Sequence, residues 1–234
     1  MKIITWNCNM AFRKKVNLLL QYKPDLLIIP ECEHPDKISF PEPPTSVIWH
    51  GDNPHKGLGV FSFGDYKLEL LSNHEPSFKT ILPLLLSNGN IDFTLFAIWA
   101  NNPQDKGSQY VGQIWKAIHH YEHLIKSEKM ILTGDFNSNT IWDKPRRIGN
   151  HTHLVEKLYL KQIKSVYHHH FNQTHGSEQH PTFNLYKNAE KPYHIDYCFV
   201  SEDIMMKLTS MQIGTFDEWR KYSDHLPLTI DFDF

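Results

Sequence analysis

Short runs of apolar and β-branched residues recur along the whole chain, separated by polar residues, prolines and glycines. Runs of this length, bounded by turn-forming residues, predict β-strands. Most of them follow one another with no helical pattern between, so we expect antiparallel or mixed sheets. The predicted strands of the first half are Ile3–Trp6, Leu26–Ile29, Val47–Trp49, Leu58–Phe63, Lys67–Leu71, Thr80–Leu86 and Phe93–Trp99. Those of the second half are Met130–Thr133, Ile163–Tyr167, His180–Tyr186, Tyr193–Val200 and Leu226–Phe232.

Apolar residues at helical spacing predict helices over Val16–Gln21, Gln109–Ile125 and His153–Leu160. None of these lies between Val47 and Phe96, where predicted strands follow one another directly. Parallel neighbouring strands need a crossover connection, usually a helix. The pattern therefore argues against a doubly wound parallel sheet and favours an α/β protein with mixed sheets.

No Gly/Ser-rich or Pro-rich linker divides the chain, and we interpret residues 1–234 as one domain. The longest apolar stretches, such as Ile81–Leu86, are far shorter than a membrane span. Charged residues at Arg13–Lys15 and Lys23 interrupt any apolar segment of a signal peptide. The three cysteines are scattered, with no C-x-x-C pair, so we expect no disulfide framework. These features predict a reduced, cytoplasmic protein without membrane contact.

The formal net charge is −2, with 16 histidines counted as neutral. A protein that coats nucleic acid carries a strongly basic balance, which this chain lacks. A nuclease needs only a local basic rim, and small phosphorylated substrates are equally compatible with the charge. Nothing in the composition indicates an oligomer, so we expect a monomer.

Polar side chains with metal-binding chemistry stand at the ends of buried predicted strands. Asn7, Glu31 and Asp135 each follow such a strand, and Asp196 lies within another. Oxygen ligands gathered at strand ends suit a hard cation such as Mg²⁺. A metal site of this kind suits the attack of water on a phosphoester.

Two local patterns sharpen this site. In Asp135-Phe136-Asn137 an extended backbone puts Asp135 and Asn137 on one side and leaves Phe136 to anchor in the core. Asp196 is the charged residue of an otherwise apolar strand, so its buried carboxylate needs a partner, for which we name His225.

The segment Ser223-Asp224-His225 requires a turn. Asp224 and His225 are neighbours and would point to opposite faces of a regular strand. They reach one site only from a turn, which Ser223 before them and Pro227 after them favour.

The ordered set Thr5-Trp6-Asn7, Pro30-Glu31, Gly134–Asn137, His194–Ser201 and Ser223–Leu228 resembles the endonuclease/exonuclease/phosphatase superfamily. The opening seven residues are similar to the start of its exonuclease III branch, and the resemblance runs from Asn7 to His225. It implies a four-layer α/β sandwich, with two mixed β-sheets packed face to face and helices outside.

The same resemblance implies roles for single residues. Asn7, Glu31 and Asp224 would form the metal shell, with Asn9 on the same face as a further substrate contact or a turn cap. Glu33 lies two residues after Glu31 and, in an extended segment, points the same way, so the residues alone leave both carboxylates open.

The resemblance also supplies the catalytic group. Asp135 would orient or deprotonate the attacking water, and Asn137 would donate to the phosphate. His225, held by Asp196, would stabilise charge that develops in the transition state.

One departure from the family pattern concerns the central strand. The family usually has a His or Tyr near its end, and Phe93–Asn102 contains neither. Trp99 or Asn101 would supply the substrate contact instead, although Trp99 also fits a core position.

Three charged or polar segments remain. Arg146 and Arg147, in a loop with Trp142, would contact a nucleic-acid backbone or form an ordinary charged surface. Arg13–Lys15 would add a phosphate contact beside the site. Consecutive histidines have poor geometry for one metal, so we interpret His168–His170 as a solvated loop.

These residues predict a phosphodiester hydrolase that acts on nucleic acid, DNA rather than RNA, with Mg²⁺ or Mn²⁺ as cofactor. The alternative keeps the site and changes the substrate to a small phosphorylated molecule, a lipid headgroup or a tyrosyl-DNA adduct. A family fold that has lost its activity would lack Glu31, Asp135 or His225, and all three are present.

Overall fold

Two six-stranded β-sheets form the centre of the protein, in a computed structural model that describes residues 1–72, 74–102 and 109–234. The first sheet has the order β13-β14-β1-β2-β4-β3 and the second the order β5-β6-β7-β8-β12-β9. In the first sheet the bounds are β13 Leu208–Ile213, β14 Leu228–Phe232, β1 Lys2–Thr5, β2 Leu26–Cys32, β4 Lys56–Ser62 and β3 Ser46–Asn53. In the second they are β5 Lys67–Leu70, β6 Ile81–Ser87, β7 Asp92–Trp99, β8 Met130–Asp135, β12 Asp196–Ser201 and β9 Ile163–Ser165.

Both sheets are mixed. β1 pairs with β2, and β7 with β8, in parallel, whereas the other pairs within these sheets are antiparallel. A separate two-stranded ribbon joins β10 (Phe183–Asn184) to β11 (Pro192–Tyr193). The mixed sheets expected from the sequence are confirmed.

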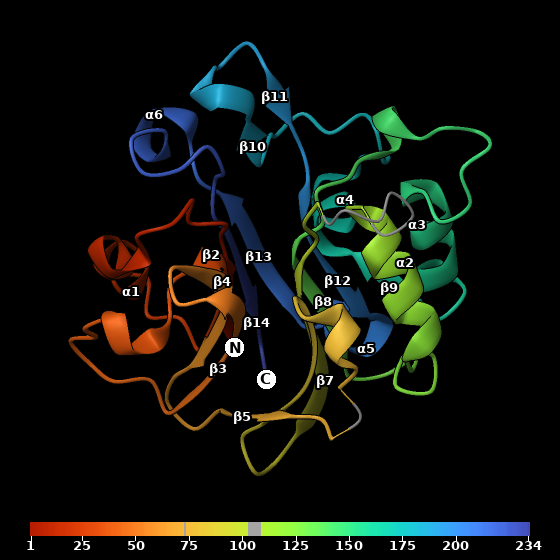
Figure 1. Ribbon diagram of the computed structural model, residues 1–234. Helices are drawn as coiled ribbons and strands as arrows, with labels where there is room; N and C mark the ends of the chain where they lie inside the picture. The colour runs from red at the N-terminus through yellow and green to blue at the C-terminus, as the bar shows by residue number, and fades with distance from the viewer. Residues whose placement is uncertain (73, 103–108) are drawn as a thin grey trace.

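Helices cover the outer face of each sheet (Figure 1), which confirms the four-layer sandwich. α2 (Val111–His120) and α3 (His151–Tyr159) pack on the second sheet, and α1 (Val16–Leu20) packs on the first. The remaining helices are short: α4 (Val166–Phe171), α5 (Glu202–Met205) and α6 (Phe216–Trp219).

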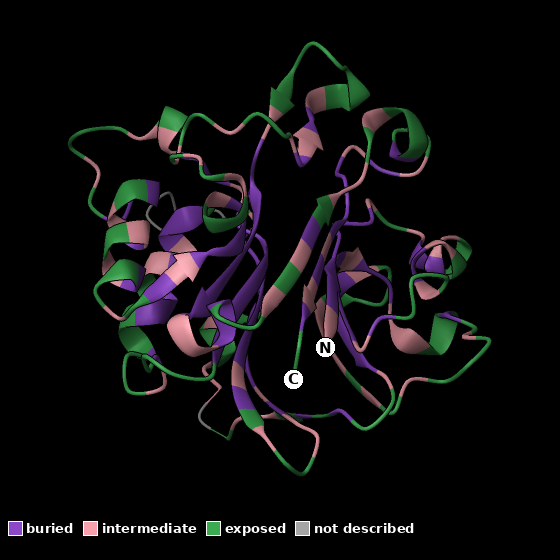
Figure 2. Ribbon diagram, turned by 180° about the vertical axis from the view of Figure 1, so that it is seen from behind, coloured by how far each residue is buried: buried purple, intermediate pink, exposed green. Residues whose placement is uncertain are grey.

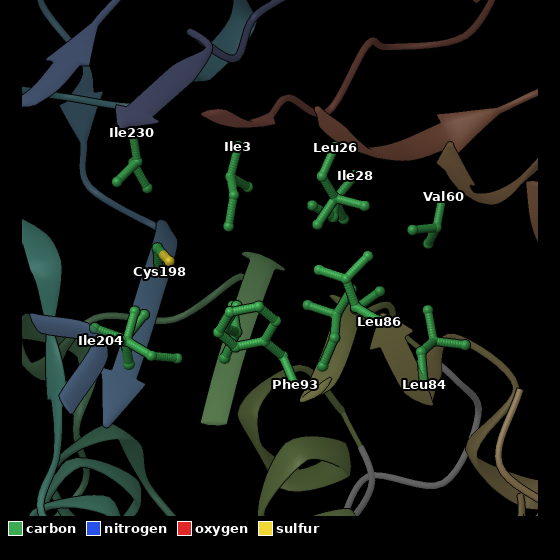
Figure 3. Close-up of a cluster of buried hydrophobic side chains, with 14 of the residues drawn as sticks. Ile3, Leu26, Ile28, Val60, Leu84, Leu86, Phe93, Cys198, Ile204 and Ile230 are labelled. Carbon is green, nitrogen blue, oxygen red and sulfur yellow. The ribbon is translucent and has the colours of Figure 1, made fainter. Parts of the chain in front are cut away.

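The largest core cluster lies between the sheets. Ile3, Leu26 and Ile28 of the first sheet face Leu86 and Phe93 of the second in Figure 3. Most central strands are buried, whereas β3 and β13 carry intermediate and exposed residues, and the other exposed residues concentrate on the outer helices and loops (Figure 2). Each sheet therefore buries one face against the other sheet, which is how an amphipathic layer is stabilised.

Some boundaries differ from the sequence prediction. β2 and β8 continue beyond the predicted ends, so Glu31 and Asp135 lie within the strands and not after them. The predicted strand Ile163–Tyr167 ends at Ser165, where α4 begins. Val166 and Tyr167 are apolar residues of strand-forming type, but burial against the main core favours the helix.

Other elements escaped the sequence pattern. Only Phe183–Asn184 of the predicted strand His180–Tyr186 is extended, and a 3₁₀ turn follows. β13, α5 and α6 were not predicted, because each is short or lacks a clear period. Among the described residues, every helix is too short or too polar to cross a lipid bilayer.

Candidate active site

Strand direction gathers the polar residues at one edge of the sandwich. β1 and β2 are parallel and end together, and the antiparallel β14 begins beside them. In the second sheet Asp135, at the end of β8, lies opposite Asp196 at the start of β12. The residues that follow β1 and precede β14 thus meet the ends of β8 and β12 across the sandwich.

Asp135 is the centre of this group and is fully buried. Its Oδ2 accepts hydrogen bonds from Nδ2 of Asn7 at 2.9 Å and Nδ2 of Asn137 at 3.0 Å, and its Oδ1 accepts from the Asn137 backbone N–H at 2.9 Å. Phe136 points into the core, as predicted.

Asn137 reaches Asp135 by a different route from the one predicted. Its φ is 48°, in the left-handed region. The side chain of Asn137 therefore returns to Asp135 through a tight turn of the backbone, and not through the extended backbone that the sequence predicted. The second hydrogen bond of its Nδ2 goes to the Ala100 carbonyl at 2.9 Å. Both N–H groups of the amide are therefore engaged.

His225 pairs with Asp196 through Nδ1 and Oδ2 at 2.9 Å, with both side chains buried. The turn that presents it is built by Ser223, whose hydroxyl donates to the Asn7 carbonyl at 2.8 Å and accepts from the His225 N–H at 3.0 Å. Asp224 accepts from Nδ2 of Asn9 at 3.0 Å. The turn expected around Asp224 and His225 is present.

Charge is concentrated here, because ligand atoms of Asp135, Asp196 and His225 all lie within 4.8 Å of one another. Burial and the nearby Asp196 carboxylate raise the pKa of Asp135 to about 7. Burial alone would lower the pKa of His225, but the Asp196 and Asp135 carboxylates outweigh it and raise that pKa to about 10. His225 is therefore a cation at neutral pH, between two carboxyl groups.

The two candidate metal carboxylates have different surroundings. Glu33 is buried, and its carboxylate accepts from the backbone N–H groups of Phe12 and Arg13 and from the Arg13 guanidinium. Glu31 sits at a bulge of β2 with φ 61°, and its carboxylate lies 3.1 Å from Nζ of Lys56. Glu33 is thus committed to the fold, and Glu31 is the carboxylate that faces the site edge.

The donor set fits a hard divalent cation. Glu31 already attracts a positive charge, Lys56, and Asp224 and Asn7 supply further oxygens at the same edge. Among the described residues, the buried Oδ1 of Asp196 accepts no hydrogen bond. A surplus of carboxylate oxygen is what a cation neutralises, and Mg²⁺ in particular binds one or two carboxylates and keeps several waters.

Trp99 and Asn101, for which a substrate contact was predicted, lie near this edge and contact other residues of the protein. Trp99 is 9% exposed and lies opposite Asp135 in the strand pairing, with Nζ of Lys56 5.3 Å from its ring centre. Asn101 donates to Oγ1 of Thr80, and its carbonyl and side-chain oxygens accept from Gln113. Trp99 thus borders the site, and Asn101 is tied into the surrounding structure.

A pocket of about 490 Å³ adjoins Asn137. Its lining combines aromatic side chains, including Tyr110, Trp142 and Phe183, with the cations Lys144 and Arg147. Arg147 also donates to the Gln109 carbonyl at 3.0 Å, whereas Arg146 is exposed and lies outside the pocket lining.

Some residues of this region carry no motif in the sequence. Phe183 packs against the His225 ring at 4.6 Å between ring centres, and Tyr110 and Lys56 also border the site. Phe183 appeared in the sequence only as part of a predicted strand, and no local signal separates these positions from ordinary surface residues.

The basic segment Arg13–Lys15 serves the fold. Arg13 pairs with Glu33, and Nζ of Lys15 donates to the carbonyls of Cys8, Met10 and Tyr222. The solvated loop predicted for His168–His170 is also wrong, because these residues belong to α4 and His168 is half-buried.

Comparisons with known proteins agree with this geometry. Residues 4–225 match the model of the Endonuclease/Exonuclease/phosphatase family. No curated protein is significantly similar in sequence.

Several solved structures share the fold. An AP endonuclease from Archaeoglobus fulgidus superposes with a TM-score of 0.73 at 18% identity, over 100% of both chains. The 3'-5' exonuclease NExo from Neisseria meningitidis gives 0.68 at 19% identity, over 100% of both chains. The endonuclease domain of TRAS1, a telomere-specific non-LTR retrotransposon, gives 0.69 at 15% identity, over 100% of this chain and 98% of that one.

Proposed function

Because the chain belongs to the Endonuclease/Exonuclease/phosphatase family and is a phosphoesterase, we propose that it is a Mg²⁺-dependent nuclease that cleaves phosphodiester bonds in DNA. The observation that carries the proposal is the buried group of Asp135, Asp196 and His225, with Asn7 bonded to Asp135. Mn²⁺ is the second metal that the oxygen donor set accepts.

Asp135 acts as the base that orients and deprotonates water. The hydrogen bonds from Asn7 and Asn137 fix its carboxylate, and its pKa of about 7 lies near neutral pH, where a general base is most effective. Since both N–H groups of Asn137 are engaged, we assign Asn137 to positioning Asp135 and not to donating to the phosphate.

His225 stabilises the phosphate as its charge develops. Asp196 accepts from Nδ1, which leaves Nε2 of the cationic ring to donate to a phosphate oxygen. Glu31, Asn7 and Asp224 would hold the divalent cation, which neutralises charge on the phosphate and on the leaving oxygen.

The pocket beside Asn137 supports a nucleic-acid substrate. Aromatic faces such as Trp142 and Phe183 suit stacking on bases or sugars, and Lys144 and Arg147 suit backbone phosphates. Arg146, exposed in the same loop, would add a phosphate contact. The solved structures with this fold include AP endonucleases and one complex with a product DNA hairpin, which favours DNA over RNA.

A second candidate is a phosphatase or phosphodiesterase for a small molecule. The net charge of −2 and the modest size of the pocket, about 490 Å³, favour it. A nucleotide with a terminal phosphate would fill such a pocket without an extended basic surface.

The test is cleavage of labelled duplex, single-stranded and abasic DNA, matching RNA and a 3'-phosphate oligonucleotide, with Mg²⁺ and with EDTA. Asp135→Asn should lower turnover by roughly 10²–10⁴-fold, because the base is lost. His225→Ala should lower it by roughly 10²–10³-fold, because a charge-stabilising donor is lost. Asp65→Asn, on an exposed turn, is the matched control and should cut like the unmodified protein.

Metal dependence separates Glu31 from Glu33 in the same assay. Glu31→Gln should raise the Mg²⁺ concentration that gives half-maximal cutting, whereas Glu33→Gln should leave that concentration unchanged in folded protein. Undiminished cutting by both Asp135→Asn and His225→Ala would reject the proposed mechanism. Release of phosphate from small substrates without any cut polymer would establish the second candidate.

A further inference from the structure

A second cluster of metal-binding side chains lies outside the candidate active site. Ligand atoms of His168, His175 and Glu178 all lie within 4.8 Å of one another. His168 comes from α4, and the other two come from the segment that follows it. This cluster shares no residue with Asp135, Asp196 and His225.

The donors are packed into the protein and held in place. The side chains of His168 and Glu178 are 9% and 4% exposed. Glu178 also accepts from the Gly176 N–H at 3.0 and 3.1 Å. Nδ1 of His168 contacts Oγ of Ser165 at 2.8 Å, which leaves Nε2 directed at Glu178, 3.1 Å away.

These contacts have the form of a metal site. Two ligands bound to one zinc ion in tetrahedral geometry lie roughly 3.4 Å apart, since each is about 2.1 Å from the ion. The separation of 3.1 Å between His168 and Glu178 is close to that value. The contact of Ser165 with the far nitrogen of His168 is the kind of outer bond that orients ligating histidines.

A simple ion pair between His168 and Glu178 accounts for only part of the cluster. The His175 ring stacks on the His168 ring at 3.5 Å between centres. The stacked rings hold their nitrogen lone pairs in nearly parallel planes, 23° apart, so one ion can bind both rings only when the His175 ring turns toward Glu178. The ion pair leaves the His175 ring unused, whereas a shared cation would use both rings and the carboxylate.

A histidine beside the cluster has no partner for one nitrogen. His194 lies 6.2 Å from His168 between ring centres and bonds through Nδ1 to the His180 carbonyl. Among the described residues its buried Nε2 makes no hydrogen bond. Buried polar atoms without a partner are uncommon in folded proteins, so this nitrogen is a further donor beside the cluster.

The cluster is also accessible. A pocket of about 220 Å³ is lined by Ser165, His168, His169 and His175, among others. An entry path is one of the requirements of a metal site, and a pocket of this volume has room for a water molecule at a fourth coordination position.

We propose that His168, His175 and Glu178 bind one transition-metal ion of the zinc class, as a structural site separate from the phosphoester site. Two imidazoles and a carboxylate form a donor set for Zn²⁺ and a poor one for Mg²⁺, which prefers oxygen.

The place of this site in the fold gives it a structural role. His175 contacts His151 at 3.4 Å, and His151 contacts Oγ of Ser138, directly after Asn137. The segment that carries His175 and Glu178 continues to Thr182, whose hydroxyl accepts from the Asp196 N–H at 3.0 Å. The bound ion would therefore brace the layer behind the candidate active site.

The experiment measures metal bound to the full chain, and it does not depend on the proposed function. Protein stripped with a chelator and dialysed is titrated with Zn²⁺, and with Co²⁺ as a spectroscopic probe. One equivalent of Zn²⁺ should bind, and a hundredfold excess over Kd should raise Tm by about 5–10 °C. Co²⁺ should give the visible absorption of a nitrogen- and oxygen-ligated ion, and Mg²⁺ should not compete.

Variants locate the ion. His175→Ala and Glu178→Gln should weaken Zn²⁺ binding by more than ~100-fold, and Ser165→Ala by roughly 10–100-fold. His170→Ala, exposed on the same helix and outside this pocket, is the matched control and should bind like the unmodified protein. Asp135→Asn should also bind Zn²⁺ like the unmodified protein, which distinguishes this site from the group of Asp135, Asp196 and His225.

Two outcomes overturn the inference. One is an unmodified protein that binds no Zn²⁺ while circular dichroism shows it folded. The other is equal binding by the His175→Ala and His170→Ala proteins, which would place the ion elsewhere.

Discussion

At the scale of single residues, Glu31 and Glu33 show how two similar carboxylates acquire different tasks. They lie two positions apart, Glu31 in β2 and Glu33 directly after it, and the bulge between Pro30 and Cys32 turns Glu31 outward to the site edge. The Glu33 carboxylate instead accepts hydrogen bonds from the backbone N–H groups of Phe12 and Arg13. A buried carboxylate that accepts several N–H groups is a stability determinant.

Glu33 gives a pH-dependent prediction. Burial by itself would raise its pKa, but the hydrogen bonds from Arg13 and Phe12 prevail and lower it from 4.5. Because the folded pKa is lowered, the stabilisation is complete above pH 4.5 and is lost as the pH falls through the folded value.

Glu33→Gln should therefore cost about 2 kcal/mol of unfolding free energy at pH 7, since charged hydrogen bonds are replaced by neutral ones. The difference from the unmodified protein should shrink below pH 4.5, where Glu33 itself becomes protonated. Urea unfolding at a series of pH values measures both quantities. A gap that is constant with pH would contradict this account.

At the scale of elements, β8 shows why a glycine precedes Asp135. Gly134 has φ 141°, and a Cβ there would lie 1.9 Å from the Ile98 carbonyl oxygen of β7. Only glycine lets the two parallel strands approach so closely while β8 continues to Asp135.

Gly134→Ala should destabilise the protein by at least about 3 kcal/mol, since the clash is with backbone that cannot rotate away. Gly89→Ala is the control, because Gly89 also has a positive φ, 85°, but has open space around it. The control should lose about 1 kcal/mol. Thermal unfolding of the two variants measures both losses of stability. Equal losses would show that the close approach of β7 and β8 is not the cause of the destabilisation at Gly134.

At the scale of the whole molecule, the ends of the chain build the site together. β1 and β14 are neighbours, and the Met1 carbonyl accepts from the Phe232 N–H at 2.8 Å. This pairing places Asn7, which follows β1, against Ser223, which precedes β14. The main core draws on both sheets, so neither sheet buries its inner face alone.

We therefore propose that residues 1–234 unfold as one cooperative unit. Urea transitions followed by far-UV circular dichroism and by tryptophan fluorescence should coincide. The fluorescence reports on both sheets, since Trp6 follows β1 and Trp99 ends β7. Separate midpoints would show that the sheets unfold independently.

Much of this protein follows from its sequence. The short apolar runs, with little helical pattern between them, predicted mixed sheets, and the polar residues at strand ends predicted a candidate site. Asp196 and His225 were paired from local context, because a charged residue in an apolar strand needs a partner, and the structure joins them by a hydrogen bond.

Other features depend on contacts between distant segments. The different surroundings of Glu31 and Glu33 depend on the bulge of β2 against β4. The second hydrogen bond of the Asn137 amide depends on the Ala100 carbonyl, directly after β7. The histidines of α4 resemble a solvated run in the sequence, and only the burial of that helix and the return of the chain at Glu178 bring His168 to a partner, while His169 and His170 stay exposed. Local periodicity reports which face a side chain takes, whereas the partners that it meets there are decided by the packing of strands far apart in the chain.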